Sequence, residues 1–268
     1  MEFEEKIEDL KNSLRKLGSV LIAYSGGVDS TFLMAVAAGI PEIDVMAVTA
    51  SNAMIPDWEI KEARRLAKKL KVKHKIIKTD PLSNPALKVN PKNRCYICKK
   101  AIFIKFLNLA QEAGYSYVAD GTNSDDLGVY RPGLKALKEL GIKSPLADTR
   151  LTKDEIRSYS KEMGLPTWDA PALACLATRI PYDEELTETK LKMIDGSEGY
   201  LRRLGFRQLR VRYHYPIARI ELGPEEIPLI LEPDIKEKVV KRLKAIGFDH
   251  VVIDLEGYRS GSMDGRKE

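Results

Sequence analysis

Apolar residues in the first 80 positions alternate between helical spacing and short continuous runs. The helical spacing predicts amphipathic helices over residues 2–17, 31–38 and 57–70. The continuous runs predict buried strands over residues 20–24, 43–50 and 72–77. Because helices and strands alternate in this rhythm, the sequence predicts an α/β domain built on a parallel sheet.

The pattern is less regular between residues 80 and 182. The segment 82–94 is rich in Pro and Asn and reads as a loop, followed by a predicted helix over 99–113 and a strand over 115–119. Thr152-Lys-Asp-Glu155 is a capping box, which predicts a helix that runs through Glu162. Residues 169–182 lack periodicity and are interrupted by prolines, which is more typical of a binding site than of a core.

From Thr187 onward the order of predicted elements changes. The expected elements are a helix over 187–204, strands over 207–213 and 218–222, a helix over 234–246 and a strand over 251–255. This order indicates a smaller α+β domain that contains an antiparallel hairpin. We place the boundary near residues 181–187, which gives one domain over 1–183 and a second over 184–268.

Charge and composition narrow the class of protein. Lys and Arg total 44 against 39 Asp and Glu, a formal net charge of +5. This mild excess suits a protein that handles anions such as nucleotides. It does not require a nucleic-acid partner, and we expect none. No apolar run approaches the ~20 residues that span a bilayer, and the highly charged N-terminus is unlike a signal peptide. We therefore expect a cytoplasmic protein without a membrane partner.

The strongest chemical signal is Ser25-Gly-Gly-Val-Asp-Ser30, between a predicted buried strand and a predicted helix. Gly26 and Gly27 allow positive φ and let the backbone approach an anion closely. The helix that follows, beginning around Thr31, offers free N–H groups and the positive end of its dipole. The segment therefore predicts a phosphate-binding loop.

The polar side chains of the loop refine this interpretation. Ser25 and Ser30 add hydroxyl donors, whereas Asp29 would repel a bare phosphate and is expected to hold a Mg²⁺ ion that binds it. The segment lacks the Gly-Lys-Ser/Thr of the Walker loop and the spacing of the dinucleotide-binding motif. The alternative is an ordinary tight turn between strand and helix.

The loop resembles the PP-loop of the N-type ATP pyrophosphatases, such as GMP synthetase, NAD synthetase, asparagine synthetase and the tRNA thiolases. A second segment, Gly121-Thr-Asn-Ser-Asp-Asp126, resembles the Gly-Thr-x-x-Asp-Asp segment of that superfamily. The resemblance covers about residues 18–150. It implies an adenine nucleotide alpha hydrolase-like fold that cleaves ATP to AMP and pyrophosphate. ATP would then contact the PP-loop, Thr31, Gly121 and Asp126, with Asp29 and Ser30 acting in catalysis.

The chain contains three cysteines, an odd number that disfavours a disulfide framework. Cys95 and Cys98 form a Cys-x-x-Cys pair, which we expect at a tight bend, and the distant Cys175 could complete a three-thiolate site with one open coordination position. Two other interpretations remain, small core residues or a structural zinc completed by His74. We favour a site that handles sulfur, with a [4Fe–4S] cluster as its expected form.

The second domain contains a pair of arginines on one predicted strand. Arg210 and Arg212 lie two positions apart and therefore share a face of the strand. Two guanidinium groups on one face can bind a phosphate with bidentate geometry. The alternative is a solvated strand face, on which alternating arginines are ordinary, and the pattern alone favours that alternative.

Several segments together resemble the LarE family, and the resemblance spans nearly the whole chain. They are Trp168-Asp169 with residues 170–182 around Cys175, Arg131-Pro-Gly133, Ser144-Pro-Leu146 and the terminal residues 258–263. LarE enzymes adenylate a carboxylate of pyridinium-3,5-dicarboxylate mononucleotide and convert it to a thiocarboxylate for a nickel-pincer cofactor. The resemblance implies ATP and Mg²⁺ as cofactors and this mononucleotide as the small-molecule substrate.

The resemblance also implies roles for residues of the second half of the chain. Substrate contacts are implied for Arg179, Arg210, Arg212 and Glu221. Tyr96 and Trp168 could stack on the pyridinium ring, since a cation is attracted to an aromatic face; simple packing is the alternative.

The LarE family has two kinds of member, which differ in their source of sulfur. One kind sacrifices a single cysteine, and the other binds a [4Fe–4S] cluster through three cysteines. With Cys95, Cys98 and Cys175, this chain resembles the second kind, in which Cys175 is a metal ligand rather than a consumed donor. A separate sulfide donor is then needed. Family members are often hexamers, so a homo-oligomer is expected.

Three other functions fit parts of the sequence. A tRNA thiolase also combines a PP-loop with cysteines, but the chain shows no extended basic surface interleaved with aromatic residues. An ammonia-using synthetase would leave the cysteines unexplained. A regulatory module that binds nucleotide without turnover would release no pyrophosphate, which an assay with candidate acids can test.

Overall fold

The computed structural model describes residues 3–128, 131–259 and 261–263. The chain forms two compact units. Unit 1 comprises Met1–Asn52, Trp58–Pro81 and Asn93–Leu173, and unit 2 comprises Ala53–Asp57, Leu82–Lys92 and Ala174–Glu268. Each unit is made of several separate stretches of the chain, because residues 53–57 and 82–92 belong to unit 2. The sequence predicted one boundary at residue 183, and that boundary stays a prediction.

Unit 1 is built on a parallel sheet of four strands in the order β3-β2-β1-β4. The strands are β1 (Ser19–Ala23), β2 (Asp44–Ser51), β3 (Lys73–Lys78) and β4 (Tyr117–Ala119). In the register of the sheet, Ile22 of β1 lies beside Ala47 of β2 and Ala119 of β4. The predicted α/β class with a parallel sheet is confirmed.

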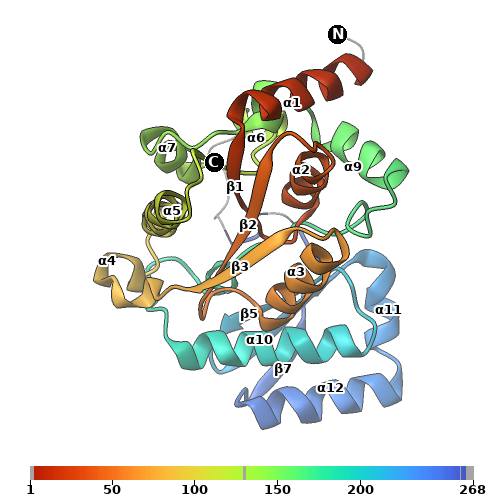
Figure 1. The fold of residues 1–268 in the computed structure, drawn as a ribbon. Coiled ribbons are helices and arrows are strands. Elements are labelled where there is room, and N and C mark those ends of the chain that lie inside the picture. Colours follow the sequence, from red (N-terminus) through yellow and green to blue (C-terminus); the bar gives the residue numbers. More distant parts are fainter. Residues whose placement is uncertain (1–2, 129–130, 260, 264–268) are drawn as a thin grey trace. The chain divides into compact units, whose positions relative to one another are not determined.

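Helices cover both faces of this sheet (Figure 1). The helices of unit 1 are α1 (Phe3–Leu17), α2 (Val28–Ala38), α3 (Asp57–Lys69), α5 (Arg94–Glu112), α6 (Ser124–Leu127), α7 (Pro132–Glu139), α8 (Pro145–Asp148) and α9 (Lys153–Glu162). Helices α2 and α3 lie on one face and α5 on the other, where it packs against α7 (Figure 1). This arrangement follows from the crossovers, because β1 leads to β2 on one side and the chain later returns to β4 on the other.

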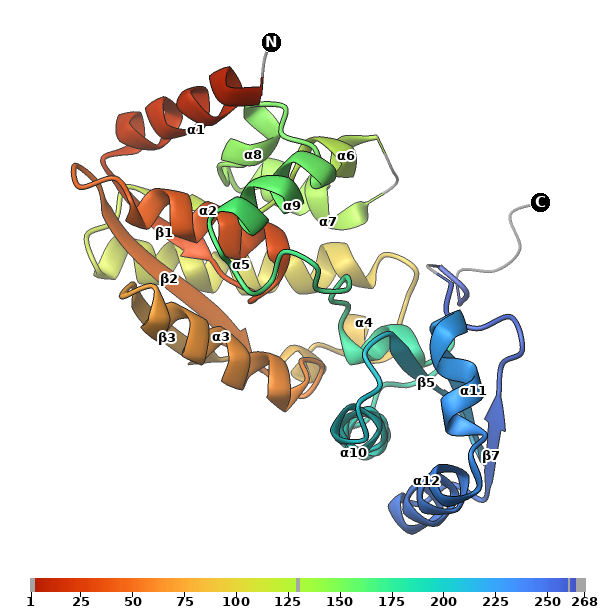
Figure 2. The ribbon, with the colours of Figure 1, turned by 90° about the vertical axis from the view of Figure 1, so that its right-hand side faces the viewer.

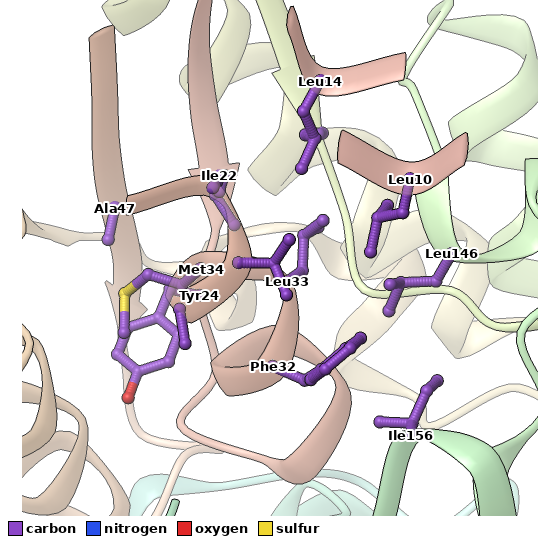
Figure 3. Close-up of a cluster of buried hydrophobic side chains, with 14 of the residues drawn as sticks. Leu10, Leu14, Ile22, Tyr24, Phe32, Leu33, Met34, Ala47, Leu146 and Ile156 are labelled. Carbon is purple, nitrogen blue, oxygen red and sulfur yellow. The ribbon is translucent and has the colours of Figure 1, made fainter. Parts of the chain in front are cut away.

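The main core of unit 1 lies around α2, which is buried on nearly every side. Phe32 and Leu33 of α2 are fully buried and lie among side chains from α1, α8 and α9, including Leu10, Leu146 and Ile156 (Figure 3). A helix that is apolar all round belongs inside a core rather than on a surface. The N-terminus of α2, and with it the preceding loop, is therefore anchored by packing.

The segment from residue 82 to 98 differs from the prediction. It contains the 3₁₀ turn η1 (Pro81–Ser83) and helix α4 (Pro85–Lys88), and α5 begins at Arg94, five residues before its predicted start. Asn84 caps α4 through its side chain, and Pro85 occupies the first helical turn. Proline and asparagine here mark helix starts rather than a loop, which is why composition misled the prediction.

Unit 2 contains a sheet of three strands in the order β5-β6-β7. Its elements after residue 174 are η2 (Leu176–Arg179), α10 (Glu188–Arg203), β5 (Leu209–His214), β6 (Ile217–Leu222), η3 (Pro224–Glu226), α11 (Ile227–Ile230), α12 (Pro233–Ile246) and β7 (His250–Ile253). Strands β5 and β6 form an antiparallel hairpin and β7 pairs in parallel with β6. Helices α10 and α12 pack against each other and against this sheet (Figure 2). The predicted second, smaller α+β domain with its hairpin is confirmed.

Helices in the described part of the chain are either too short or too polar to cross a bilayer.

Candidate functional site

The loop between β1 and α2 has the backbone that its glycines were expected to allow. Gly26 has φ of +79°, and Gly27 is the N-cap of α2. A Cβ atom at Gly26 would lie 3.3 Å from the Cβ of Ala63 on α3, so a larger residue would crowd that helix. Positive φ and close packing therefore both require glycine at position 26.

The serines of the loop are held in place by hydrogen bonds within it. The Oγ atoms of Ser25 and Ser30 lie 3.0 Å apart, and the N–H of Gly27 donates to Ser25 Oγ at 3.3 Å. The first turn of α2 supplies further N–H groups and the positive end of the helix dipole. Thr31 is fully buried and its N–H donates to the carbonyl of Gly27, so its side chain faces the core. Its expected contact with ATP stays a prediction.

The second predicted nucleotide segment lies directly beside the first. Strands β1 and β4 are neighbours, and the loops that follow them leave the same edge of the parallel sheet. A Cβ atom built on Gly121 would lie 2.9 Å from the backbone nitrogen of Ser30, so only glycine fits. The order of the strands reverses between β1 and β4, and α/β sheets bind ligands at such a switch point.

Asp29 has two polar partners, and neither adjoins it in the sequence. Its Oδ1 accepts a hydrogen bond of 3.1 Å from Asn123 Nδ2, and its Oδ2 lies 2.5 Å from the ammonium of Lys153. Asn123 belongs to the segment after β4, and Lys153 is the first residue of α9. Asp125 anchors the backbone of Lys153 by accepting its N–H at 2.8 Å.

Asp126 contributes a second carboxylate next to Asn123. It forms a capping box with Asn123 at the start of α6, and its Oδ1 pairs with Arg131 at 2.8 Å. Mg²⁺ in phosphate sites is bound by one or two carboxylates, water and phosphate oxygens, so the oxygen donors of Asp29 and Asp126 suit this ion. In residues 3–128, 131–259 and 261–263, no group of three or more His, Cys, Asp or Glu side chains is arranged to hold a metal.

The three cysteines divide between the two units. Cys95 and Cys98 lie in the first two turns of α5 in unit 1, and Cys175 immediately precedes η2 in unit 2. Spacing of three on a helix places the first two thiols on one face, so the predicted tight bend is replaced by a helical turn. Cys95 is exposed and the other two are half-buried, and no disulfide joins the three. Their exposure argues against the interpretation as core residues.

A buried ion pair holds the backbone around Cys175. Arg179 Nη1 donates to the carbonyls of Ala174 at 2.7 Å and Cys175 at 3.0 Å. Its Nε and Nη2 each donate to one carboxylate oxygen of Glu198 at 2.9 Å. Glu198 Oε1 also accepts the N–H of Val211 on β5. Arg179 thus fixes the cysteine turn, and its expected contact with substrate stays a prediction.

Arg210 and Arg212 share a face of β5, and this face is covered. Each of the two side chains is only 4 % exposed, so the alternative of a solvated strand face is wrong. Arg212 pairs with Glu221 at 2.6 Å and donates to the carbonyl of Thr178 at 3.0 Å. The guanidinium carbon of Arg210 lies 5.0 Å from the ring centroid of Tyr258.

Several guanidinium groups lie close together in this arginine network. Burial, together with the nearby positive charge of Arg179, lowers the pKa of Arg210. Arg212 and Arg219 share the carboxylate of Glu221, which is fully buried. Guanidinium groups gathered in this way can bind a phosphate with bidentate geometry.

The end of the chain contributes to the same network. Ser262 Oγ accepts a hydrogen bond of 2.8 Å from Arg212 and donates one of 2.9 Å to Glu221. The terminal segment 258–263, noted above for its resemblance, therefore contacts the arginine pair within unit 2. Ser260 of that segment lies outside the described residues.

The two aromatic candidates each carry a cation over the ring. Tyr96 donates to Glu139 at 2.7 Å, and the ammonium of Lys100 lies 5.3 Å from its ring centroid. The ammonium of Lys161 lies 4.8 Å from the ring centroid of Trp168. A pyridinium ring stacked on either face that bears an ammonium would have to displace it. That use of them stays a prediction.

His74 belongs to a polar network beside the PP-loop. Its Nε2 lies 2.8 Å from Thr49 Oγ1, which donates to the carbonyl of Tyr24 at 2.7 Å. Burial, with the charge of Arg64, lowers the pKa of His74, and burial raises that of Tyr24 to about 12. Among the described residues, His74 belongs to no group of three or more His, Cys, Asp or Glu side chains that could hold a metal, and the structural-zinc alternative stays untested.

Comparison with known proteins identifies the family. The chain is 43% identical over 261 residues to an uncharacterised protein of Synechocystis, which is 97% of each chain. It is 36% identical over 253 residues to the pyridinium-3,5-bisthiocarboxylic acid mononucleotide synthase of Lactiplantibacillus plantarum, covering 94% of this chain and 91% of the synthase. The chain belongs to the LarE family.

More distant similarity fits the wider superfamily. The chain is 26% identical over 215 residues to a glutamine-hydrolysing GMP synthase chain of Thermoplasma volcanium, covering 72% of this chain and 67% of that one. No protein-family model matches the chain. Membership of the LarE family and this weaker likeness agree with the PP-loop fold of unit 1.

Sequence reasoning missed two charged residues that this LarE-family structure brings to the candidate sites. Lys153 was read only as part of a capping box, although the first residue of a helix after a polar loop is a common position for an anion ligand. Glu198 lies in an amphipathic helix, where an acidic residue gives no signal that it will be buried. Its partner Arg179 is 19 positions away.

Proposed function

We propose that this protein is an ATP-dependent, AMP- and pyrophosphate-forming sulfur transferase. It would convert a carboxylate of pyridinium-3,5-dicarboxylate mononucleotide to a thiocarboxylate during synthesis of a nickel-pincer cofactor. The observation that carries the proposal is the similarity to the L. plantarum synthase over nearly the full length of both chains. The PP-loop at the switch point and the buried arginine pair support it independently.

The first reaction activates the acid. A carboxylate resists a sulfur nucleophile, because both are anionic and oxide is a poor leaving group. In the proposed step a carboxylate oxygen attacks the α-phosphorus of ATP, the bond to the β-phosphate breaks, and pyrophosphate leaves. A sulfur nucleophile then attacks the acyl carbon, and AMP leaves with the carboxylate oxygen.

Unit 1 would stabilise the departing pyrophosphate. Ser25, Ser30 and the N–H groups at the start of α2 would supply hydrogen-bond donors from one short loop, and donors aimed at developing charge lower a barrier strongly. Asp29 would hold Mg²⁺, with Asp126 nearby, and this ion would neutralise phosphate charge when bound. Gly121 would keep the second loop close enough to enclose the nucleotide.

Unit 2 would bind the phosphate of the acid substrate. Arg210 and Arg212 are candidates because two buried guanidinium groups on one strand face suit a phosphate. Glu221 would hold Arg212 in position through its ion pair. Arg179 would hold the turn at Cys175 in a fixed conformation, in addition to its proposed contact with the substrate.

Sulfur would be handled by the cysteines. Cys95, Cys98 and Cys175 supply thiolates, which are the ligands of [4Fe–4S] clusters, and the helical spacing of the first two suits a shared metal. Such a cluster, when bound, supplies an iron with an open position that can carry sulfide. Cys175 would then be a ligand and would remain intact, and sulfur would come from a separate donor.

The experiment uses protein purified without oxygen. Iron and acid-labile sulfide are measured, followed by pyrophosphate release and thiocarboxylate formation with the pyridinium dicarboxylate mononucleotide. We expect release that depends on the acid, and multiple turnovers with a sulfide source. Release without dependence on the acid contradicts the proposed substrate. Protein that holds no iron, or full turnover by Cys95→Ala, contradicts the cluster.

A further inference from the structure

The carboxylate of the PP-loop is already paired with a positive charge. Asp29 Oδ2 lies 2.5 Å from Lys153 Nζ, and Asp29 was expected to hold a divalent cation. The ammonium therefore lies against one of the two oxygens that a metal would use. The other oxygen accepts a hydrogen bond from Asn123, which leaves the carboxylate oriented toward the lysine.

Lys153 is built so that its backbone is fixed and its side chain can move. It is the first residue of α9, where Asp125 accepts its N–H and the capping box of Thr152 and Glu155 fixes the helix start. Its side chain is 30 % exposed. A lysine stem has four rotatable carbons, so the ammonium can change partners while the helix stays in place.

Two other cations of unit 1 have carboxylate partners of their own. Arg131 pairs with Asp126 at 2.8 Å, and Lys99 lies 3.8 Å from Asp120. Walker loops carry a lysine for the β- and γ-phosphates inside the motif, and this loop has none. Helix α9 brings a lysine to the loop from 124 positions away.

We propose that the ammonium of Lys153 is paired with the carboxylate of Asp29 in the nucleotide-free protein, and that Mg²⁺–ATP displaces the ammonium from this carboxylate. The metal takes the carboxylate, and the released ammonium binds the phosphates that leave as pyrophosphate. Metal and lysine thus compete for Asp29 until nucleotide supplies a new anion for the lysine. The identity of the nucleotide rests on the proposed function, whereas the competition for Asp29 does not.

This exchange has a consequence for the order of binding. Before nucleotide arrives, a divalent cation must displace the ammonium and leave it without an anionic partner. Once phosphates are present, both cations have oxygen ligands. The site therefore binds metal weakly alone and tightly with nucleotide, and the leaving pyrophosphate gains a positive charge that the loop itself lacks.

The test measures Mn²⁺ binding to nucleotide-free protein by the electron paramagnetic resonance signal of the free ion. Lys153→Met removes the competing ammonium, so we expect Mn²⁺ to bind on the order of tenfold more tightly than to the wild type. Lys153→Arg keeps the positive charge and should bind Mn²⁺ as the wild type does. Lys105→Met, an exposed lysine on α5, is the matched control and should change nothing.

A second variant assigns the effect to the carboxylate. Adding Asp29→Asn to Lys153→Met should abolish the tighter Mn²⁺ binding. The same Lys153→Met protein should bind a non-hydrolysable ATP analogue with Mg²⁺ about tenfold more weakly, because a phosphate contact is lost. Mn²⁺ affinity that is unchanged or weaker in Lys153→Met overturns the proposal, as does unchanged analogue binding.

These measurements can fail independently of the proposed function. Mn²⁺ binding without nucleotide involves neither turnover nor the acid substrate. Tighter Mn²⁺ binding in Lys153→Met without any acid-dependent pyrophosphate release would support the exchange at Asp29 and contradict the sulfur transferase. Acid-dependent pyrophosphate release, together with Mn²⁺ binding that Lys153→Met leaves unchanged, would support the sulfur transferase and contradict the exchange at Asp29. Circular dichroism of each variant establishes that the fold is kept.

Discussion

Two ion pairs, one in each unit, differ in how far their side chains are exposed to water. Lys153 and Asp29 in unit 1 are 30 % and 22 % exposed, whereas Arg179 and Glu198 in unit 2 are 2 % and 1 % exposed. The first pair lies at the end of a phosphate loop. The second supports a cysteine turn and a strand. The distance between nitrogen and oxygen is short in both pairs, so exposure rather than distance distinguishes them.

The difference decides what each pair can do. An ion pair that water reaches is worth little, because solvent screens both charges, so a ligand can replace one partner at small cost. A buried pair cannot open without leaving a charge unsolvated, which is strongly unfavourable. The pair in unit 1 therefore suits exchange during a reaction cycle, and the pair in unit 2 suits a fixed framework.

The largest effect is expected from Glu198→Gln, which leaves Arg179 buried without a full negative partner. Burial alone would raise the pKa of Glu198, but the charge and hydrogen bonds of Arg179, the charge of Arg210 and the N–H of Val211 together lower it, so the carboxylate is ionised in the folded protein. We expect the free energy of unfolding to fall by about 3 kcal/mol, measured by urea denaturation. Glu188→Gln, on the exposed side of the same helix, is the control and should have no measurable effect. A Glu198→Gln protein as stable as the wild type would remove the contrast between the units.

The next effect is on catalysis in unit 1. Asp29→Asn keeps the size of the side chain but weakens both metal binding and the pairing with Lys153. We expect pyrophosphate release to fall by about 10²-fold with little loss of stability, because water reaches both partners of the pair. Asp154→Asn, an exposed neighbour on α9, should keep full activity. Equal losses of activity in both variants would remove Asp29 from the site.

A smaller effect separates the two substrates. Arg210→Met should raise the KM of the acid substrate about tenfold and leave the KM of ATP unchanged, because the lost guanidinium lies in unit 2. Steady-state kinetics with each substrate varied in turn measures the split. Arg207→Met, an exposed residue just before β5, is the matched control. Parallel changes in both KM values would contradict a phosphate role for Arg210.

The smallest effect concerns the network beside the PP-loop. Burial lowers the pKa of His74 below the ordinary value of 6.5. As pH falls, this residue is therefore protonated in the unfolded chain before it is protonated in the folded protein. Stability from this residue is present above pH 6.5 and is lost as pH falls below it. Between pH 7.5 and 5.5 we expect Tm to decrease by about 1–2 °C more in the wild type than in His74→Gln. Identical pH profiles would show that protonation of His74 is not linked to folding.

The sequence by itself determined the local features. Ser25 to Ser30 between a strand and a helix defined the phosphate loop, because glycine spacing and helix position are properties of adjacent residues. The capping box at Thr152 marked the start of α9 to the residue. Alternation in β5 placed Arg210 and Arg212 on one face, since side chains of a strand have a period of two.

Only the tertiary structure decided which distant residues meet and which charges are buried. The pairing of Asp29 with Lys153 joins positions 124 apart and depends on the order of the strands, which no local pattern encodes. Periodicity showed that two arginines share a face but not that other elements cover it, so the solvated alternative seemed the better interpretation. The periodicity of a strand shows which side chains share a face of that strand. Whether they are buried and what they pair with depends on how separate elements pack.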